Sequence, residues 1–380
     1  MMIFLTILLN EMKVGILTYH FGTNFGGQLQ CYSLFNVLKE LGHNPIIINY
    51  DPCKISVGFL NDFRHALRIV KNERSINGIV NSFNTILYSS KMRDNFKVYQ
   101  NTYLNIGPKC SLEEISTKYS DLDAIIVGSD QVWAPAHHWN GAYFINVGKE
   151  FKGRRIAYAP CCAINKVDDT NKNLIVNLLS KFDSLSARNN ETFQFVKDLI
   201  GVDVPIVADP TLLCGFDNYK SSKTPKGKYI LVYVLGDEID GGHRNVIRKI
   251  EESYPKMPIY SISLTNSKPH YFSWATKNYY TLNPEDWVEF IKNASFLYTD
   301  SFHGVVFAMK FHKPFIAYYK EKIRASRFID LKNRFGLQNI FNHVSEIKDV
   351  KSIQPQYKEL DKKISDLKEF SINYLKQALS

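Results

Sequence analysis

Short apolar runs alternate with amphipathic stretches along most of the chain, and this alternation gives a first expectation of its fold. Residues 14–19 form an apolar run that predicts a strand, and residues 45–50 form a second one. Between these runs, apolar side chains recur at the spacing of one helix face, at Leu34, Val37, Leu38 and Leu41. The resulting βαβ unit predicts a parallel sheet, because its crossover connection is right-handed.

The same alternation continues in two series towards the end of the chain. Further strands of the first series are predicted at residues 124–127, 155–159 and 204–208. A polar stretch at residues 218–228 marks a linker, and the strands predicted after it are residues 229–235, 258–264, 294–298 and 314–318. An amphipathic pattern at residues 357–379 predicts a terminal helix.

The length of 380 residues favours two domains over one compact core. We therefore predict an α/β protein in which two doubly wound, Rossmann-like domains face each other across a cleft. The N-terminal domain is expected at residues 13–217, with a basic helical insertion at residues 54–110, and the C-terminal domain at residues 218–345. Residues 346–380 are expected to form a helical segment that packs back on the N-terminal domain.

The formal net charge is +10, and the predicted insertion carries a large part of it. Residues 54–110 hold nine basic and three acidic side chains, a net charge of +6. Apolar side chains recur there at helix-face spacing, at Phe59, Leu60, Phe63, Leu67 and Val70. One interpretation is a basic amphipathic surface that approaches anionic lipid, as a peripheral membrane contact, or a pyrophosphate-linked substrate. The other, which we favour because charge runs are usually solvated, is a helical insertion that covers the first domain.

Several partners and sites are not expected. Nucleic acid is not expected, because the sequence has no recognised binding module and no basic stripe with base-stacking aromatic side chains. The six cysteines include no CxxC pair, so we predict reduced thiols, no metal site and no cofactor. Residues 1–9 are apolar, but they are far fewer than the roughly 20 residues that span a bilayer, and they lack the basic start of a signal peptide. We predict a cytoplasmic protein, free or at the inner face of the membrane, with its native start at Met12.

The turn at residues 299–304 is the most informative candidate for a functional site. It follows the strand predicted at residues 294–298 and precedes an apolar run that predicts a buried helix. Ligands bind at such carboxyl ends of strands in open α/β sheets, and helix N-termini attract anions. Ser301, His303 and Gly304 therefore indicate an anionic, phosphorylated ligand, and His303 adds a group that can transfer a proton near neutral pH.

Other segments bring polar side chains to predicted strand ends. A glycine turn at residues 24–28 allows close approach of a ligand, or is simply a tight turn. At residues 128–133, Asp130 is a candidate base and Trp133 could stack on a sugar ring, unless the segment is an Asx turn with a packing tryptophan. The candidates on this side of the cleft are His20, Asn24, Gly26, Gly27, Gln28, Ser129, Asp130, Gln131 and Trp133.

Two charged residues follow apolar stretches of the first series. Arg188 precedes a predicted helix, and arginine binds carboxylate or phosphate with two parallel hydrogen bonds. The alternative for Arg188 is a salt bridge at a strand end. Asp209 begins a turn at residues 209–211, for which we favour a structural role, with Asp209 orienting a neighbour across the cleft as the alternative.

Taken in order, these segments resemble the polysaccharide pyruvyl transferase family. The resemblance extends from Val14 to about Leu337 and is fairly specific in the order and spacing of its pieces. The matching segments are residues 24–30, 128–133, 186–188, 209–213, 300–304 and 324–337. It implies a two-domain fold of the glycosyltransferase-B type and transfer of a pyruvyl group from phosphoenolpyruvate to sugar hydroxyls, usually as a ketal. It also implies a role in capsule or exopolysaccharide biosynthesis, with a saccharide acceptor that is lipid-linked or free.

The resemblance also implies roles for individual residues. His303 would hold the donor phosphate and act as general acid, and Asp130 is a candidate base. The donor-binding candidates are Arg188, Ser301, His303, Gly304, Arg324 and Arg327. Some members of the family have Arg-Leu-His where this chain has Ser301, Phe302 and His303, so either Arg324 or Arg327 replaces the missing arginine, or donor binding differs.

Two other functions stay open at this point. One is a glycosyltransferase of the same fold that uses a nucleotide sugar. The other is a non-catalytic subunit of a polysaccharide assembly complex, which the missing arginine beside His303 favours. Binding of phosphoenolpyruvate, of a nucleotide diphosphate or of neither would separate the three.

Overall fold

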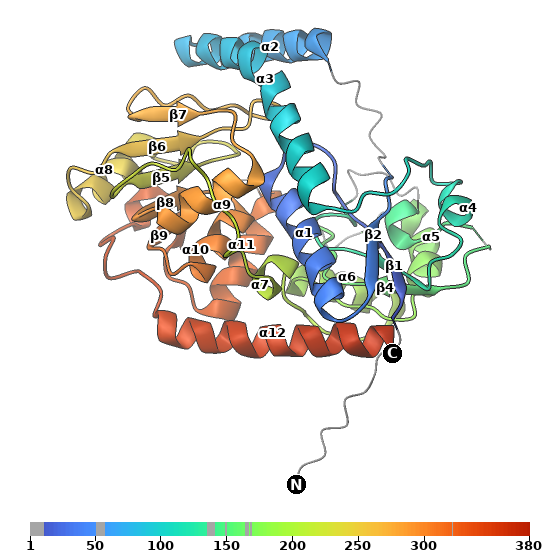
Figure 1. Cartoon of the computed structure of the whole chain (residues 1–380). Coiled ribbons are helices and arrows are strands. Elements are labelled where there is room, and N and C mark those ends of the chain that lie inside the picture. Colours follow the sequence, from blue (N-terminus) through green and yellow to red (C-terminus); the bar gives the residue numbers. More distant parts are fainter. Residues whose placement is uncertain are drawn as a thin grey trace.

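A computed structural model describes residues 11–50, 58–134, 141–148, 150–163, 167, 169–320 and 322–380. Within these ranges the strands form two sheets, and all of their ladders are parallel (Figure 1). The first sheet has the order β2 (Asn44–Ile47), β1 (Lys13–Leu17), β3 (Ala124–Val127) and β4 (Arg154–Ala157). The second has the order β10 (Ile340–Phe341), β9 (Phe315–Tyr318), β8 (Phe296–Thr299), β5 (Ile230–Tyr233), β6 (Ile259–Ile262) and β7 (Lys277–Tyr279).

Helices connect the strands of both sheets. Those of the first part of the chain are α1 (Phe25–Glu40), α2 (Phe59–Glu73), α3 (Ile76–Tyr103), α4 (Ile115–Lys118), α5 (Asp169–Leu179), α6 (Asn190–Ile200) and α7 (Pro210–Leu213). Those of the second part are α8 (His243–Ser253), α9 (Pro284–Asn293), α10 (Phe302–Lys310), α11 (Lys322–Phe335) and α12 (Tyr357–Leu379). In the part of the chain that the structure describes, no helix is both long enough and apolar enough to cross a membrane.

The central strands are short and fully buried. All four residues of β3, and all four of β8, are buried. Parallel strands covered by helices on both faces need apolar side chains on both faces, so they form continuous apolar runs instead of alternating ones. This is why the apolar runs of the sequence predicted these strands.

Both sheets have a point at which the order of the strands reverses. In the first sheet this point lies between β1 and β3, and in the second it lies between β5 and β8. Chain segments leave such neighbouring strands towards opposite faces of the sheet, which opens a crevice at their carboxyl ends. The segment after β1 leads into the first turn of α1, which occupies the position of the predicted glycine turn at residues 24–28. The segments after β3 and β8 carry Asp130 and His303, respectively.

The two Rossmann-like domains share one continuous apolar core. A single cluster of buried side chains contains Val14 of β1 and Tyr233 of β5. The ring of Phe25, at the start of α1, stacks on Trp287 of α9 with 5.7 Å between ring centroids. Helix α3 adds to the junction, because its Tyr99 hydroxyl lies 2.6 Å from that of Tyr219. The first turn of α1 is therefore held directly against the second domain.

The fold confirms the expected α/β class with two parallel sheets, but it differs from the predicted elements in places. The strand predicted at residues 204–208 is wrong: Ile206 makes only an isolated bridge with Ala187. Pro205 interrupts that segment and has no N–H for a ladder. The short edge strands β7 and β10 were not predicted. The prediction of a native start at Met12 concerns residues 1–10, which lie outside the described residues.

Candidate functional site

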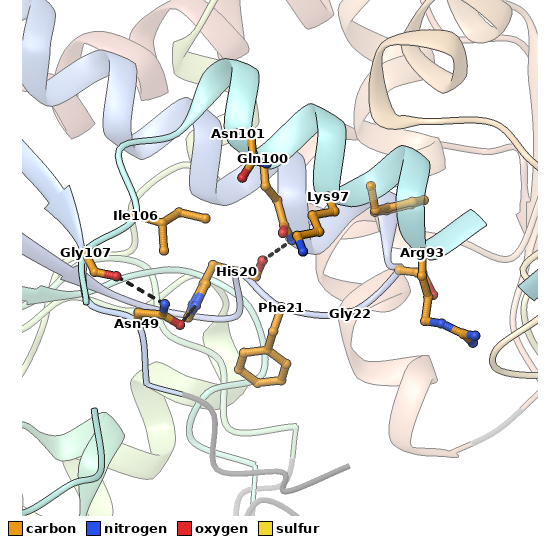
Figure 2. Close-up of a pocket in the computed structure, with 12 residues that line it drawn as sticks. His20, Phe21, Gly22, Asn49, Arg93, Lys97, Gln100, Asn101, Ile106 and Gly107 are labelled. Carbon is orange, nitrogen blue, oxygen red and sulfur yellow. Dashed lines mark hydrogen bonds between the residues drawn. The ribbon is translucent and has the colours of Figure 1, made fainter. Parts of the chain in front are cut away.

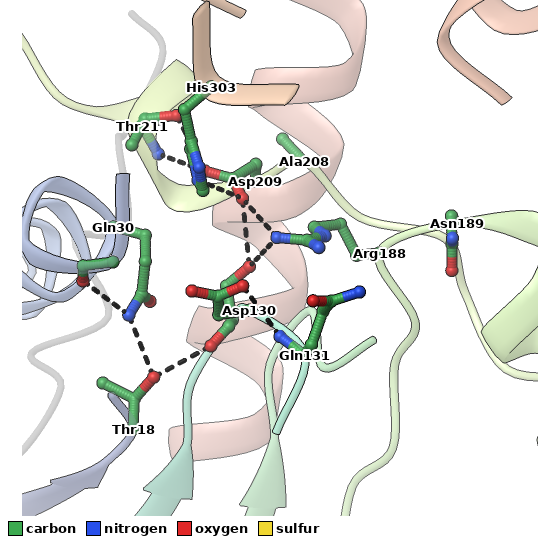
Figure 3. A network of polar contacts seen from close by, with 12 residues as sticks. Thr18, Gln30, Asp130, Gln131, Arg188, Asn189, Ala208, Asp209, Thr211 and His303 are labelled. Atoms are coloured by element: carbon green, nitrogen blue, oxygen red, sulfur yellow. Dashed lines mark hydrogen bonds and ion pairs between the residues drawn. The ribbon is translucent and has the colours of Figure 1, made fainter. Parts of the chain in front are cut away.

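Loops from both domains meet in a buried polar cluster. It consists of Ser129 and Asp130 after β3, Arg188 before α6, Asp209 before α7 and His303 in the first turn of α10. Figure 3 shows the side chains of Arg188 and His303 directed at Asp209 from different elements. Four of the predicted site residues therefore lie together, around an aspartate for which the sequence favoured a structural role.

A buried ion pair forms the centre of this cluster. Arg188 Nη1 lies 3.0 Å from Asp209 Oδ2, and both side chains are 2% exposed. The Ser129 hydroxyl donates to the same Asp209 oxygen at 3.0 Å and accepts from Arg188 Nη1 at 3.3 Å. Burial raises the pKa of Asp209, but its interactions with His303, Arg188 and Thr211 outweigh burial and hold that pKa below its ordinary value. Asp209 is therefore a carboxylate, and it balances the charge of Arg188.

Arg188 retains donors that this ion pair does not use. Its Nε and Nη2 atoms are buried, and they make no hydrogen bond within the described residues. Burial lowers the pKa of Arg188, but Cys161, Asp209 and Asp130 raise it by more than burial lowers it, so the side chain stays charged. A thiol such as that of Cys161 is only a weak acceptor. A buried guanidinium with two unused donors is suited to bind an anion with paired oxygens, such as a carboxylate or phosphate.

His303 is enclosed between the two domains. Its Nε2 lies 3.5 Å from Asp209 Oδ2. Its Nδ1 lies against the first turn of α1, since a Cβ added to Gly26 would be 2.0 Å from that atom. The adjacent Phe302 places its ring over the guanidinium of Arg188, with 4.6 Å between the guanidinium carbon and the ring centroid. Phe302 therefore helps to hold Arg188 in place by a cation–π contact.

Asp130 occupies a strained position next to the glycine turn. Its φ of 85° lies in the left-handed region, where few residues other than glycine, asparagine and aspartate are found. Its Oδ1 accepts from the Gln131 backbone N–H at 2.8 Å, and its Oδ2 lies 3.5 Å from where a Cβ of Gly27 would be. Such strain concentrates at functional sites when the surroundings enforce it.

Thr18 and Gln30, which the sequence did not single out, fix the loop that carries Asp130. The Thr18 hydroxyl donates to the carbonyl of Ser129 at 2.8 Å. The Gln30 amide donates in turn to Thr18 Oγ1 at 3.0 Å and to the carbonyl of Gly27 at 2.9 Å. Their only signal in the sequence was that both are polar: Thr18 lies within the strand predicted at residues 14–19, and Gln30 follows the segment of residues 24–28. Asp209 had a clearer signal, because Asp-Pro-Thr is a helix N-cap sequence that follows an apolar segment.

Several predicted ligand residues instead shape the loops. Of the two interpretations of Trp133, the structure supports the packing tryptophan over sugar stacking, because its ring is fully buried against Phe144 and its Nε1 donates to the carbonyl of Tyr143. The Asn24 side chain caps α1, and that of Ser301 caps α10. The Gln28 amide also shapes its loop, since it donates to the carbonyls of His20 and Gly22. Gly304 allows close packing, because a Cβ there would lie 2.6 Å from Thr299 Oγ1.

A cavity of about 480 Å³ opens on the other side of the glycine turn (Figure 2). Residues 20–23 line it from the first domain, together with Asn49, whose Oδ1 lies 3.2 Å from His20 Nε2. Helix α3 supplies the opposite wall with Arg93, Lys97 and Gln100. The segment from His20 to Gly27 therefore has this cavity at one end and the His303 cluster at the other.

The basic residues of α11 lie on a helix that supports Arg188. The Arg334 guanidinium donates to the backbone carbonyl of Arg188 at 2.9 Å and pairs with Asp330. Arg327 is half-buried on the same helix, next to Ser326, whose hydroxyl bonds Glu191 of α6. The side chain of Arg324 lies outside the described part of the structure. Arg334, which the sequence did not single out, contacts the cluster through the backbone of Arg188.

Solved structures with the same arrangement have two Rossmann-like domains of the glycosyltransferase-B type. Arabidopsis thaliana UGT89C1 complexed with UDP-L-rhamnose matches 97% of this chain and 99% of its own, with a TM-score of 0.55 and 10% identity. A putative UDP-N-acetylglucosamine 2-epimerase from Listeria monocytogenes matches 97% of this chain and 91% of its own, with a TM-score of 0.48 and 13% identity. The first likeness shows the fold, and a comparison with curated protein sequences finds no match.

The fold thus defines a glycosyltransferase-B-like protein with a charged cluster where its domains meet. The chain belongs to the polysaccharide pyruvyl transferase family, whose model matches residues 24–319. This range contains every residue of the cluster, from Ser129 to His303. The protein is therefore a transferase of polysaccharide biosynthesis.

Proposed function

We propose that this protein transfers a pyruvyl group from phosphoenolpyruvate to two hydroxyls of a sugar, forming a ketal. The observation that carries the proposal is the pair of unused buried donors on Arg188, beside a histidine in the first turn of a helix. Phosphoenolpyruvate has a carboxylate and a phosphate, and each offers the paired oxygens that a guanidinium binds. The N-terminus of α10 adds a partial positive charge on the same side.

The proposed reaction consumes one donor and two hydroxyl groups. His303 delivers a proton to C3 of the donor, which makes C2 electrophilic, and the first sugar oxygen bonds to C2 as Asp130 takes its proton. The C2–O bond to phosphate then breaks, the second sugar oxygen bonds to C2, and its proton leaves with the phosphate. The proton taken by Asp130 returns to His303, so both residues end as they began. Asp209, 3.5 Å from His303 Nε2, would stabilise the protonated imidazole.

The acceptor would approach from the cavity beside His20. That cavity adjoins the segment whose other end, at Gly26 and Gly27, contacts His303 and Asp130. Its lining from α3 is basic and amide-bearing, with Lys97 and Gln100 among the residues that face it. These side chains suit a saccharide that carries a phosphate or diphosphate group.

The test measures phosphate released from phosphoenolpyruvate in the presence of a saccharide acceptor extract. His303→Gln should lower turnover by about 10²-fold or more, since general acid catalysis is worth roughly 10²–10⁴-fold. Arg188→Lys should remove the thermal stabilisation by phosphoenolpyruvate, because an ammonium cannot form the same two-pronged contact. The control is His312→Gln, which alters an exposed histidine just beyond the other end of α10. Near-normal turnover in His303→Gln would reject the proposal.

A second candidate is a glycosyltransferase that uses a nucleotide sugar. The fold favours it, because UGT89C1, which shares the arrangement of domains, was solved with UDP-L-rhamnose. Thermal unfolding with phosphoenolpyruvate and with UDP separates the two candidates. Stabilisation by UDP alone, with no response to phosphoenolpyruvate, would favour the glycosyltransferase.

A further inference from the structure

Helix α2 turns its apolar side chains outward. The residues that face α3 and the rest of the protein are Asp62, Ala66 and Ile69, which are buried. The large apolar side chains on the other side are between 39% and 71% exposed; these are Phe59, Leu60, Phe63, Leu67 and Val70. A surface helix of a soluble domain has the opposite arrangement, with its apolar stripe against the core.

The first half of α3 repeats this reversal. Its buried positions are small or polar, at Gly78, Asn81, Asn84, Thr85 and Ser89. The Thr85 hydroxyl lies 3.4 Å from the carbonyl of Thr265, so the polar face contacts the second domain. Apolar side chains at helical spacing are between 49% and 80% exposed on the outer side, at Ile76, Ile79, Phe83 and Leu87.

Together, α2 and the first half of α3 form an apolar surface that the rest of the chain does not cover. We call residues 58–90 the α2–α3 hairpin. Nine large apolar side chains are exposed on it, whereas exposed apolar residues elsewhere in the described structure are scattered, such as Val202 and Phe370. Grouped apolar exposure of this kind marks a site of interaction with another protein or with a membrane.

The charges on the hairpin distinguish between these two partners. Its exposed charged side chains are all basic: Arg64, Arg68, Lys71 and Arg74. Of its two acids, Asp62 is buried against Arg93, at 2.7 Å, and Glu73 is half-buried and accepts from Asn81. An amphipathic helix with apolar residues on one face and only basic charges beside them is suited to the interface of a bilayer with anionic lipids.

We propose that the α2–α3 hairpin docks this protein on an anionic lipid surface. The hairpin lies at one edge of the molecule, where α2 extends from the body, while α12 lies at the opposite edge (Figure 1). Helix α3 then runs from the hairpin to the cavity, where Arg93, Lys97 and Gln100 line the wall. From Leu87 to Gln100 this path is about 20 Å at 1.5 Å per residue. The docking does not depend on which transfer reaction the protein performs.

The test is co-sedimentation of the full chain with vesicles of phosphatidylcholine alone or mixed with phosphatidylglycerol. The wild-type protein should bind the mixed vesicles and bind the neutral ones at least about tenfold more weakly. The triple variant Phe63→Ser, Leu67→Ser, Phe83→Ser removes apolar contacts, and Arg64→Glu, Arg68→Glu, Lys71→Glu reverses the charge. Each should lower affinity for the mixed vesicles by about tenfold or more, because anchoring needs both apolar burial and charge.

Phe370→Ser is the matched control, because Phe370 is 49% exposed on α12, outside the hairpin. It should bind the mixed vesicles like the wild type. The changed side chains are exposed, so circular dichroism and the thermal midpoint should show folded protein in all variants. Absence of wild-type binding, or equal binding by the triple variants, would overturn the proposal. So would a wild-type dimer that becomes a monomer in the serine variant without any vesicle binding, since a second copy would then be the partner.

Discussion

Gly26 determines how closely the two domains approach at His303. A methyl group there would lie 2.0 Å from His303 Nδ1, so the imidazole or the helix that carries it must move. We expect Gly26→Ala to lower the thermal midpoint and to reduce phosphate release at least about tenfold, because a shift of about 1 Å in a catalytic group has effects of up to 10²-fold. Calorimetry and the turnover assay measure the two effects.

Gly27→Ala is the control for this prediction. The nearest atom to a Cβ at Gly27 is Asp130 Oδ2, at 3.5 Å, which is ordinary contact. Alanine is a better helix former than glycine by about 1 kcal/mol, so Gly27→Ala should be neutral or stabilising. Equal behaviour of the two variants would show that the contact with His303 does not constrain the site.

Asp209 should make the free energy of unfolding depend on pH. Its folded-state pKa is depressed below the ordinary 3.8, because its interactions with His303 and Arg188 outweigh burial. Such a group contributes stability that is present above the unfolded-state pKa and is lost as pH falls through the folded-state pKa. We therefore expect the free energy of unfolding to fall as pH drops below about 4, with this carboxylate among the causes.

Asp209→Asn isolates that contribution. At pH 7 it should cost about 3–5 kcal/mol, because it leaves the buried Arg188 without its counter-charge. The difference from the wild type should shrink as pH falls below about 4, because the unfolded wild-type chain then binds a proton at Asp209 that the folded protein does not. Urea unfolding at a series of pH values gives both curves. Asp361→Asn, in an exposed pair with His312, should cost less than about 1 kcal/mol at any pH; a constant difference for Asp209→Asn would contradict this account.

The turn between β8 and α10 shows what could be predicted from local sequence. Two apolar runs sufficed to predict the strand and the buried helix, because each of these depends on neighbouring residues. Ser301, between them, was predicted as a donor ligand, and in the structure its side chain caps α10. Asp209 shows what could not. Its partner Arg188 is 21 positions away in the same domain, and His303 is 94 positions away in the other. Tertiary packing brings the first pair together, and the packing of the two domains brings in His303. The burial of Trp133 likewise depends on Phe144, in a different segment.

Ser301 should act on helix α10 through its cap. Its hydroxyl accepts from the Gly304 N–H at 3.2 Å. Ser301→Ala should cost about 1 kcal/mol of stability, whereas Ser301→Thr should retain most of it, because threonine also caps helices. Chemical denaturation of the two variants checks this. If Ser301→Thr were as unstable as Ser301→Ala, or if Ser301→Ala lost phosphoenolpyruvate binding at full stability, the serine would be a ligand rather than a cap.

Helix α12 connects both domains and also reaches the backbone of the site. Near its beginning the Tyr357 hydroxyl donates to the carbonyl of Lys313, in the second domain. Near its end the Ser371 hydroxyl accepts from the Ala208 N–H at 2.8 Å, and the Tyr374 hydroxyl donates to the carbonyl of Ala157 at 2.9 Å. Ala208 precedes Asp209, so a hydrogen bond from the terminal helix holds the residue next to the centre of the cluster.

Of these two contacts of α12, we expect that of the smaller side chain, Ser371, to contribute more to the free energy of unfolding than that of Tyr374. Ser371→Ala leaves the buried Ala208 N–H without an acceptor, which costs about 1–3 kcal/mol. Tyr374→Phe leaves the carbonyl of Ala157 with two other donors, the N–H and hydroxyl of Ser186. We expect Ser371→Ala to lower both the free energy of unfolding and the rate of phosphate release, and Tyr374→Phe to affect both less. The reverse order would mean that α12 stabilises the protein through its packing and does not position Asp209.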